Sequence, residues 1–166
     1  MINPIVKKDE GNNSKIDYLL EMGGEANAEP KVTQEFYYDS IKYRWGRVVT
    51  EYSDIVNLTE LFPEENKNVV MYAFANINSA KDTTIKALAG SDDGIEVFIN
   101  GKSVLQNSSD GKLIPDAFSF SLPLKKGKNN LLLKITQTDG EWGFTFRLPD
   151  SEVRNSKNRY RIVDQN

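Results

Sequence analysis

The chain has 166 residues, of which 21 are basic and 24 are acidic, and it contains neither histidine nor cysteine. Without these two residue types, the chain cannot form a Ser-His-Asp triad, a cysteine nucleophile, an iron–sulfur cluster, a disulfide or a zinc site of nitrogen and sulfur ligands. The near balance of charge gives no electrostatic reason to bind nucleic acid. Carboxylate, lysine and hydroxyl chemistry remains, which leaves paired-acid glycoside hydrolysis and calcium coordination open.

The first third of the chain carries weak signals. Residues 1–13 are polar, and we expect a flexible lead-in there. A short helical pattern begins with Ser14 as its cap and stops at Gly23-Gly24, although a strand fits the same apolar positions. Alternation of apolar and polar residues over residues 41–49 predicts a strand. Asn57 is placed to cap a further short helical turn, so we expect one or two short helices in all.

From Val69 onward, every apolar segment has the pattern of a strand. The longest apolar run, residues 69–75, is far shorter than the roughly 20 residues that cross a bilayer, so we interpret it as a buried strand and expect no membrane insertion. Asn100-Gly101 is the favoured dipeptide of a type I′ turn and predicts a hairpin. Apolar residues of a single parity predict further strands over residues 83–89, 118–124, 131–135 and 142–148.

These strands follow one another at intervals of about 8–14 residues with no helix between them, as in an antiparallel sandwich. The pattern predicts an all-β fold, an antiparallel jelly-roll β-sandwich that spans residues 14–148. Residues 149–166 are polar apart from a few apolar side chains near the end, and we expect a tail, a linker or one edge strand there.

Two motifs resemble those of galactose-binding-like jelly-roll modules, such as the sugar-binding domains of β-galactosidase-type glycoside hydrolases and protective-antigen-like modules. The first is GSDDGIEVFINGK at residues 90–102. The second is LKKGKNNLLLK at residues 124–134, followed by WGFTFRL at residues 142–148. The resemblance covers about residues 41–148. It implies a non-catalytic carbohydrate-binding accessory domain of a larger, exported, bacterial protein, with a poly- or oligosaccharide as ligand and with linked catalytic or surface-anchoring domains as partners.

The location implied by the resemblance is extracellular or at the cell surface. The N-terminal residues have no apolar region of signal-peptide length, so we expect that the targeting segment is absent from this chain, with a cytoplasmic location as the alternative.

The candidate carbohydrate-binding residues are acidic or aromatic. The adjacent carboxylates of Asp92 and Asp93 can accept hydrogen bonds from sugar hydroxyls or bind calcium. Such a pair is also typical of a turn in which the carboxylates accept hydrogen bonds from local backbone N–H groups. Aromatic rings can stack on the apolar face of a sugar, although the parity of the two tryptophans predicts that both point toward the core. We expect no cofactor, and a structural calcium ion would need further ligands, with Asp116 and Asp139 as candidates. The six candidate binding residues are Asp92, Asp93, Trp45, Trp142, Tyr38 and Tyr52.

Two other functions stay open at this stage. One is a structural or protein-interaction β-sandwich without a sugar site. The other is a small glycoside hydrolase, in which Glu96 would act with Glu51 or Glu141 across a groove, although a glutamate on the solvated face of a strand is commonplace. The lysines of residues 125–128 could attract an anionic glycan, but a solvated turn is the simpler interpretation.

Overall fold

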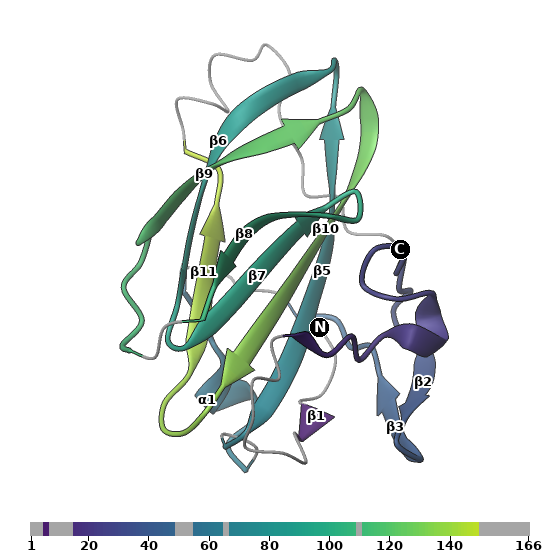
Figure 1. Cartoon of the computed structure of the whole chain (residues 1–166), viewed down its shortest axis with the longest axis vertical. Helices are drawn as coiled ribbons and strands as arrows, with labels where there is room; N and C mark the ends of the chain where they lie inside the picture. The colour runs from purple at the N-terminus through teal and green to yellow at the C-terminus, as the bar shows by residue number, and fades with distance from the viewer. Residues whose placement is uncertain (1–4, 7–14, 49–54, 65–66, 109–110, 150–166) are drawn as a thin grey trace.

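The structure, a computed structural model, describes residues 5–6, 15–48, 55–64, 67–108 and 111–149. Its strands are β1 (Ile5–Val6), β2 (Glu35–Tyr38), β3 (Ile41–Arg44), β4 (Ile55–Asn57), β5 (Val69–Ser79), β6 (Thr83–Ser91), β7 (Gly94–Ile99), β8 (Lys102–Asn107), β9 (Phe118–Leu124), β10 (Gly127–Gln137) and β11 (Gly143–Arg147). One sheet has the order β1-β5-β10-β7-β8 and a second has the order β4-β11-β6-β9 (Figure 1). All pairings are antiparallel, which confirms the all-β antiparallel sandwich.

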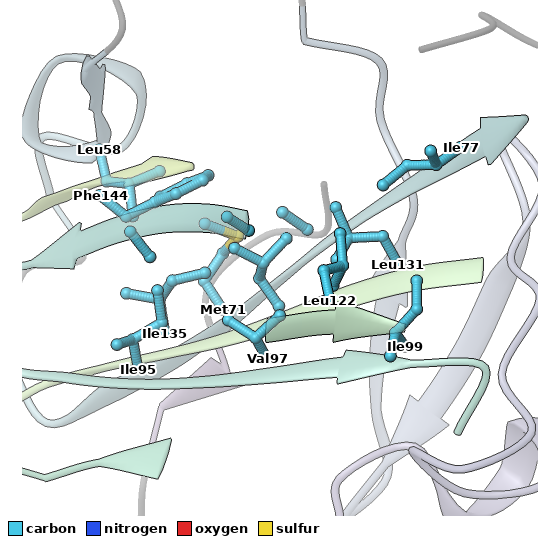
Figure 2. Packing of buried hydrophobic residues seen from close by; sticks show 14 of the residues in the cluster. Leu58, Met71, Ile77, Ile95, Val97, Ile99, Leu122, Leu131, Ile135 and Phe144 are labelled. Atoms are coloured by element: carbon cyan, nitrogen blue, oxygen red, sulfur yellow. The ribbon is translucent and has the colours of Figure 1, made fainter. Parts of the chain in front are cut away.

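The space between the two sheets is filled by the apolar residues whose alternate positions in the sequence predict the strands. On β10 these are Leu131, Leu133 and Ile135, and their counterparts on the facing sheet include Leu122 and Phe144. Figure 2 shows Leu131 and Ile135 of β10 directed into a common core with Leu122 and Phe144. Because successive side chains of a strand point to opposite faces, alternate apolar residues are enough to build this layer.

The outer face of the five-stranded sheet is also covered, by residues 15–45, which we call the cap. The cap contains a 3-10 helix, η2 (Leu20–Met22), and the hairpin of β2 and β3, and it lies beside β5 on the side away from the four-stranded sheet (Figure 1). A second apolar cluster joins the two parts: Tyr18, Leu19, Ala28, Phe36, Tyr43 and Trp45 pack against Val70, Tyr72, Phe98 and Leu132. Burial on both faces explains why residues 69–73 form an unbroken apolar run.

The cap differs from what the sequence predicts. The expected helix from Ser14 to Gly23 is reduced to η2, and Ser14 itself lies outside the described residues. Gly23 and Gly24 have φ of +90° and +81°, a backbone conformation that ends a helix. The strand expected over residues 41–49 ends at Arg44, because it pairs with β2, which is also only four residues long. Most of the expected lead-in, 1–13, and nearly all of the tail, 149–166, lie outside the described residues.

Two local predictions are confirmed. The helix α1 (Leu58–Leu61) is capped by Asn57, whose Oδ1 accepts a hydrogen bond of 3.2 Å from the backbone N–H of Glu60. The β7–β8 hairpin turns at Asn100 and Gly101, which have φ of +49° and +77° as a type I′ turn requires. Within the described ranges, no helix is long and apolar enough to cross a membrane.

Candidate functional site

The predicted Asp92-Asp93 pair lies in the β6–β7 turn and holds neighbouring loops. Asp92 Oδ1 accepts a hydrogen bond of 2.9 Å from the backbone N–H of Leu113. Asp93 accepts from the backbone N–H of Gly111 at 3.4 Å and of Thr138 at 2.7 Å. Burial is the main cause that raises the pKa of Asp92. These contacts match the turn interpretation, in which the two carboxylates satisfy loop backbone groups.

The proposed calcium helpers have other partners. Asp116 forms an ion pair with Arg147, and Asp139 lies 3.3 Å from the ammonium of Lys67. Across the parts of the chain that the structure describes, no group of three or more acidic side chains could hold a metal ion.

The two candidate tryptophans are core residues, as their parity predicts. Trp45 is 3% exposed and donates its indole N–H to Met22 Sδ at 3.3 Å, while Trp142 is 2% exposed. Neither ring offers a face to a sugar, and this removes both from the candidate site. Tyr38 is half-buried and packs edge-on against Tyr18, with ring centroids 4.8 Å apart. Tyr52 lies outside the described residues.

Of the glutamates in the hydrolase hypothesis that the structure describes, Glu96 and Glu141 lie on different elements. Glu96 lies on the outer face of β7, and its partner across the ladder is Lys134 of β10 rather than a second carboxylate. Glu141 is exposed in the loop between β10 and β11, and Glu51 lies outside the described residues.

A groove of about 390 Å³ lies where the cap meets the sandwich. Residues 25–29 of the cap form one wall, and the β7–β8 and β9–β10 turns form the other. Phe74 and Leu132, which are ladder partners on β5 and β10, line it with apolar surface. The volume falls within the range of about 300–1,000 Å³ that is usual for ligand sites. The lining residues are Glu25, Ala26, Asn27, Ala28, Glu29, Phe74, Asn100, Gly101, Lys125, Lys128, Asn130 and Leu132.

Hydrogen bonds across the groove fix its polar rim. Glu29 of the cap accepts from Asn130 Nδ2 at 2.7 Å and from Lys128 Nζ at 3.3 Å. The Asn130 Oδ1 atom in turn accepts from Asn76 Nδ2 at 2.9 Å. The hydrogen bond from Asn130, followed by that from Lys128, lowers the pKa of Glu29. The Glu29 carboxylate is therefore ionised at neutral pH and can accept hydrogen bonds from a ligand.

The sandwich side of the groove is held by one buried amide, that of Asn129. Its Nδ2 donates to the backbone carbonyls of Ile77, Lys125 and Gly127, at 3.2, 2.8 and 3.0 Å. Its Oδ1 accepts from the Lys125 N–H and from Asn100 Nδ2, both at 2.8 Å. One side chain thus ties the β9–β10 turn to the β7–β8 turn, and both turns contribute to the groove.

A buried ion pair ties the cap to the sheet beside the groove. Lys134 is 1% exposed on its side chain, and its Nζ lies 2.8 Å from Glu25 Oε1 and donates to the carbonyl of Ile16 at 2.6 Å. The Tyr72 hydroxyl donates to the same Glu25 oxygen. Burial raises the pKa of Tyr72 well above its usual value. Burial also raises the pKa of Glu25, and the hydrogen bonds from Lys134 and Tyr72 offset only part of this increase. We call these three side chains the latch.

The close approach of the cap to the sandwich also depends on Gly101. A Cβ atom at this position would lie 2.1 Å from the carbonyl oxygen of Ala26. A side chain here would therefore displace the cap loop that forms one groove wall, in addition to straining the turn.

Sequence reasoning missed the groove because its residues come from four separate segments of the chain. Two signals pointed toward it. Lys134 is a charged residue within the otherwise apolar run from Leu131 to Ile135, which indicates a buried and paired cation. Asn129 lies two residues before Leu131 and has the same inward-facing parity, where a buried amide needs several partners.

Comparison with known proteins gives little further guidance. No family model matches the chain, and no curated protein matches it. Among solved structures, the chain is similar to the PA14 domain of MpAFP, an antifreeze protein, with 16% sequence identity and a TM-score of 0.44. The matched region covers 58% of this chain and 48% of that chain, so the likeness spans about half of the antifreeze protein's chain.

Proposed function

We propose that the protein is a non-catalytic carbohydrate-binding module whose ligand occupies the groove between the cap and the sandwich. The observation that carries this proposal is the combination of an apolar surface at Phe74 with a rim of carboxylates, amides and ammonium groups. A sugar ring has an apolar C–H face and a rim of hydroxyls, so it needs an aromatic or aliphatic surface beside fixed donors and acceptors. Glu29 and Asn130 supply such groups and hold each other in place.

The wider setting is part of the same proposal. We take the sandwich to be a jelly-roll module of the galactose-binding-like kind, carried by an exported bacterial protein that acts on glycans or sits at the cell surface. A module of this type holds a linked catalytic domain close to its polysaccharide. The linked domain acts faster because the module raises its effective concentration at the polysaccharide, and the module itself needs no reactive group.

The test is a saccharide screen followed by calorimetric titration of the wild-type chain and two variants. Glu29→Gln removes the charge of the groove acceptor, and we expect binding to weaken about tenfold, because hydrogen bonds to charged groups contribute more than neutral ones. Glu35→Gln is the matched control, since Glu35 is also an exposed cap carboxylate with a lysine partner, Lys42 at 3.4 Å, but it does not line the groove.

Absence of binding to every plant, microbial and host glycan in the screen would refute the proposal. An equal loss in the Glu29→Gln and Glu35→Gln variants would move the site away from the groove.

One observation favours a second function, that of a protein-interaction domain. Three large apolar side chains of the cap are exposed: Leu20 is 72% and both Tyr37 and Ile41 are 52% exposed. Apolar residues that remain on a surface can mark a protein contact. Sedimentation of the wild type and of a Leu20→Ser/Ile41→Ser variant would test this function: concentration-dependent association that the variant abolishes supports it, and a monomer at all concentrations counts against self-association.

A further inference from the structure

The charges around the groove are mostly paired within the protein. Glu25 is neutralised by Lys134, and Glu29 by Lys128. Both carboxylates therefore act as hydrogen-bond acceptors that are already balanced by a cation, and neither leaves a net negative charge in the groove to repel an anionic ligand.

Lys125 differs from these lysines. It lines the groove and is exposed, and among the described residues no carboxylate forms an ion pair with it. Its backbone is held on both sides by Asn129, which accepts from the Lys125 N–H and donates to the Lys125 carbonyl, both at 2.8 Å. The ammonium group thus projects from a fixed point on the groove wall, and no carboxylate in the described part of the chain forms an ion pair with it.

We propose that the groove selects an acidic oligosaccharide, in which the carboxylate of a uronic acid residue binds Lys125 while the sugar hydroxyls bind the Glu29–Asn130 rim. This inference rests on the proposed function and names the substrate class. One uncompensated ammonium matches one carboxylate. Of the two lysines that line the groove, Lys128 is paired with Glu29, so most charges of a phosphorylated or nucleic acid ligand would have no cationic partner among the described lining residues.

The experiment compares two ligands of the same shape, tri-galacturonic acid and its fully methyl-esterified form, by calorimetric titration. We expect the free acid to bind up to about fivefold more tightly at low salt, which is the size of effect that an exposed ion pair gives. Raising the ionic strength to about 0.5 M should reduce this preference, because an exposed pair is screened.

Two lysine variants locate the effect. Lys125→Met should abolish the preference for the free acid over the methyl ester. Lys126→Met is the matched control and should keep the preference, because Lys126 belongs to the same turn and is exposed but does not line the groove.

Equal affinity for the acid and the ester in the wild type would overturn the inference while leaving a neutral sugar site intact. A preference that survives Lys125→Met would also overturn it. Absence of binding to both trisaccharides, together with a neutral glycan that does bind in the screen, would overturn the acidic class alone. Absence of binding to all glycans would remove the proposed function as well.

Discussion

The two faces of the five-stranded sheet are built from the same strands but differ in what they bury. The inner face of β10 presents Leu131, Leu133 and Ile135, all within one apolar cluster. Its outer face presents Leu132 and Lys134, the first in the cap cluster and the second in the latch. From Leu131 to Ile135 the inner face stabilises the sandwich through apolar burial, whereas the outer face combines apolar packing with a buried ion pair and ends in a polar groove.

This difference indicates where a ligand-binding site can arise on a β-sandwich. The layer between the two sheets is filled mainly by apolar side chains, which leaves little room for a ligand and few polar groups to bind one. The outer face gains both, because the cap covers the middle of the sheet but leaves the groove beside Phe74 and Asn130. A buried ion pair adds little net stability, but it fixes geometry, and here it holds Glu25 at the groove edge.

The largest expected effect comes from breaking the latch on one side. Glu25→Ala leaves Lys134 buried without its carboxylate, and we expect a loss of about 3–5 kcal/mol in the free energy of unfolding. The double variant Glu25→Leu/Lys134→Met should recover most of this loss, because it leaves no buried charge. Urea denaturation of the three proteins checks both statements, and a single variant as stable as the wild type would contradict them.

The second prediction separates the two faces directly. Leu133→Ala and Leu132→Ala remove the same atoms from neighbouring residues on opposite faces, and each should cost about 3 kcal/mol. Leu133→Ala should destabilise the whole sandwich. Leu132→Ala should mainly release the cap. Hydrogen exchange monitors the difference: loss of protection confined to residues 15–45 is expected for Leu132→Ala, and identical patterns for both variants would refute the distinction.

The third prediction concerns the buried amide that holds the groove turns. Asn129→Ala leaves three backbone carbonyls without their side-chain donor, and we expect a cost of about 2 kcal/mol together with weaker binding in the groove. Asn78→Ala, at an exposed position of β5, is the control and should change stability by less than about 0.5 kcal/mol. Equal effects of the two substitutions in thermal unfolding would show that Asn129 has no special role.

The smallest expected effect is the pH dependence of the latch. Because burial raises the pKa of Glu25 above 4.5, the folded chain holds that proton more tightly than the unfolded chain. Its contribution to stability is fully present below the unfolded-state pKa and is lost as pH rises through the folded-state pKa. The unfolding free energy of the wild type minus that of Glu25→Gln should therefore fall from about pH 4 upward and then level off. A difference that rises with pH would contradict the direction of the shift.

Much of the sandwich could be predicted from the sequence. Alternation placed Leu122 and Phe144 inside, Asn100-Gly101 marked its hairpin, and the parity of Trp45 and Trp142 indicated that both are buried. The strand β3 lies within the strand predicted over residues 41–49, but its partner β2 and the hairpin that the two form were not predicted, because four-residue strands that pack on a neighbouring sheet show too short a pattern. The groove was missed for a related reason, since no single segment contains more than a few of its residues.

The pattern of apolar residues fixes which side of each main strand faces the core, because backbone geometry sends successive side chains to opposite faces. What covers the other side of the five-stranded sheet depends on long-range packing. The cap folds back onto β5 and β10 through contacts between residues that are far apart in the sequence. Lys134 pairs with Glu25, and Asn130 donates a hydrogen bond to Glu29, in both cases across about 100 positions. No local pattern encodes such contacts, since they depend on how the whole chain packs.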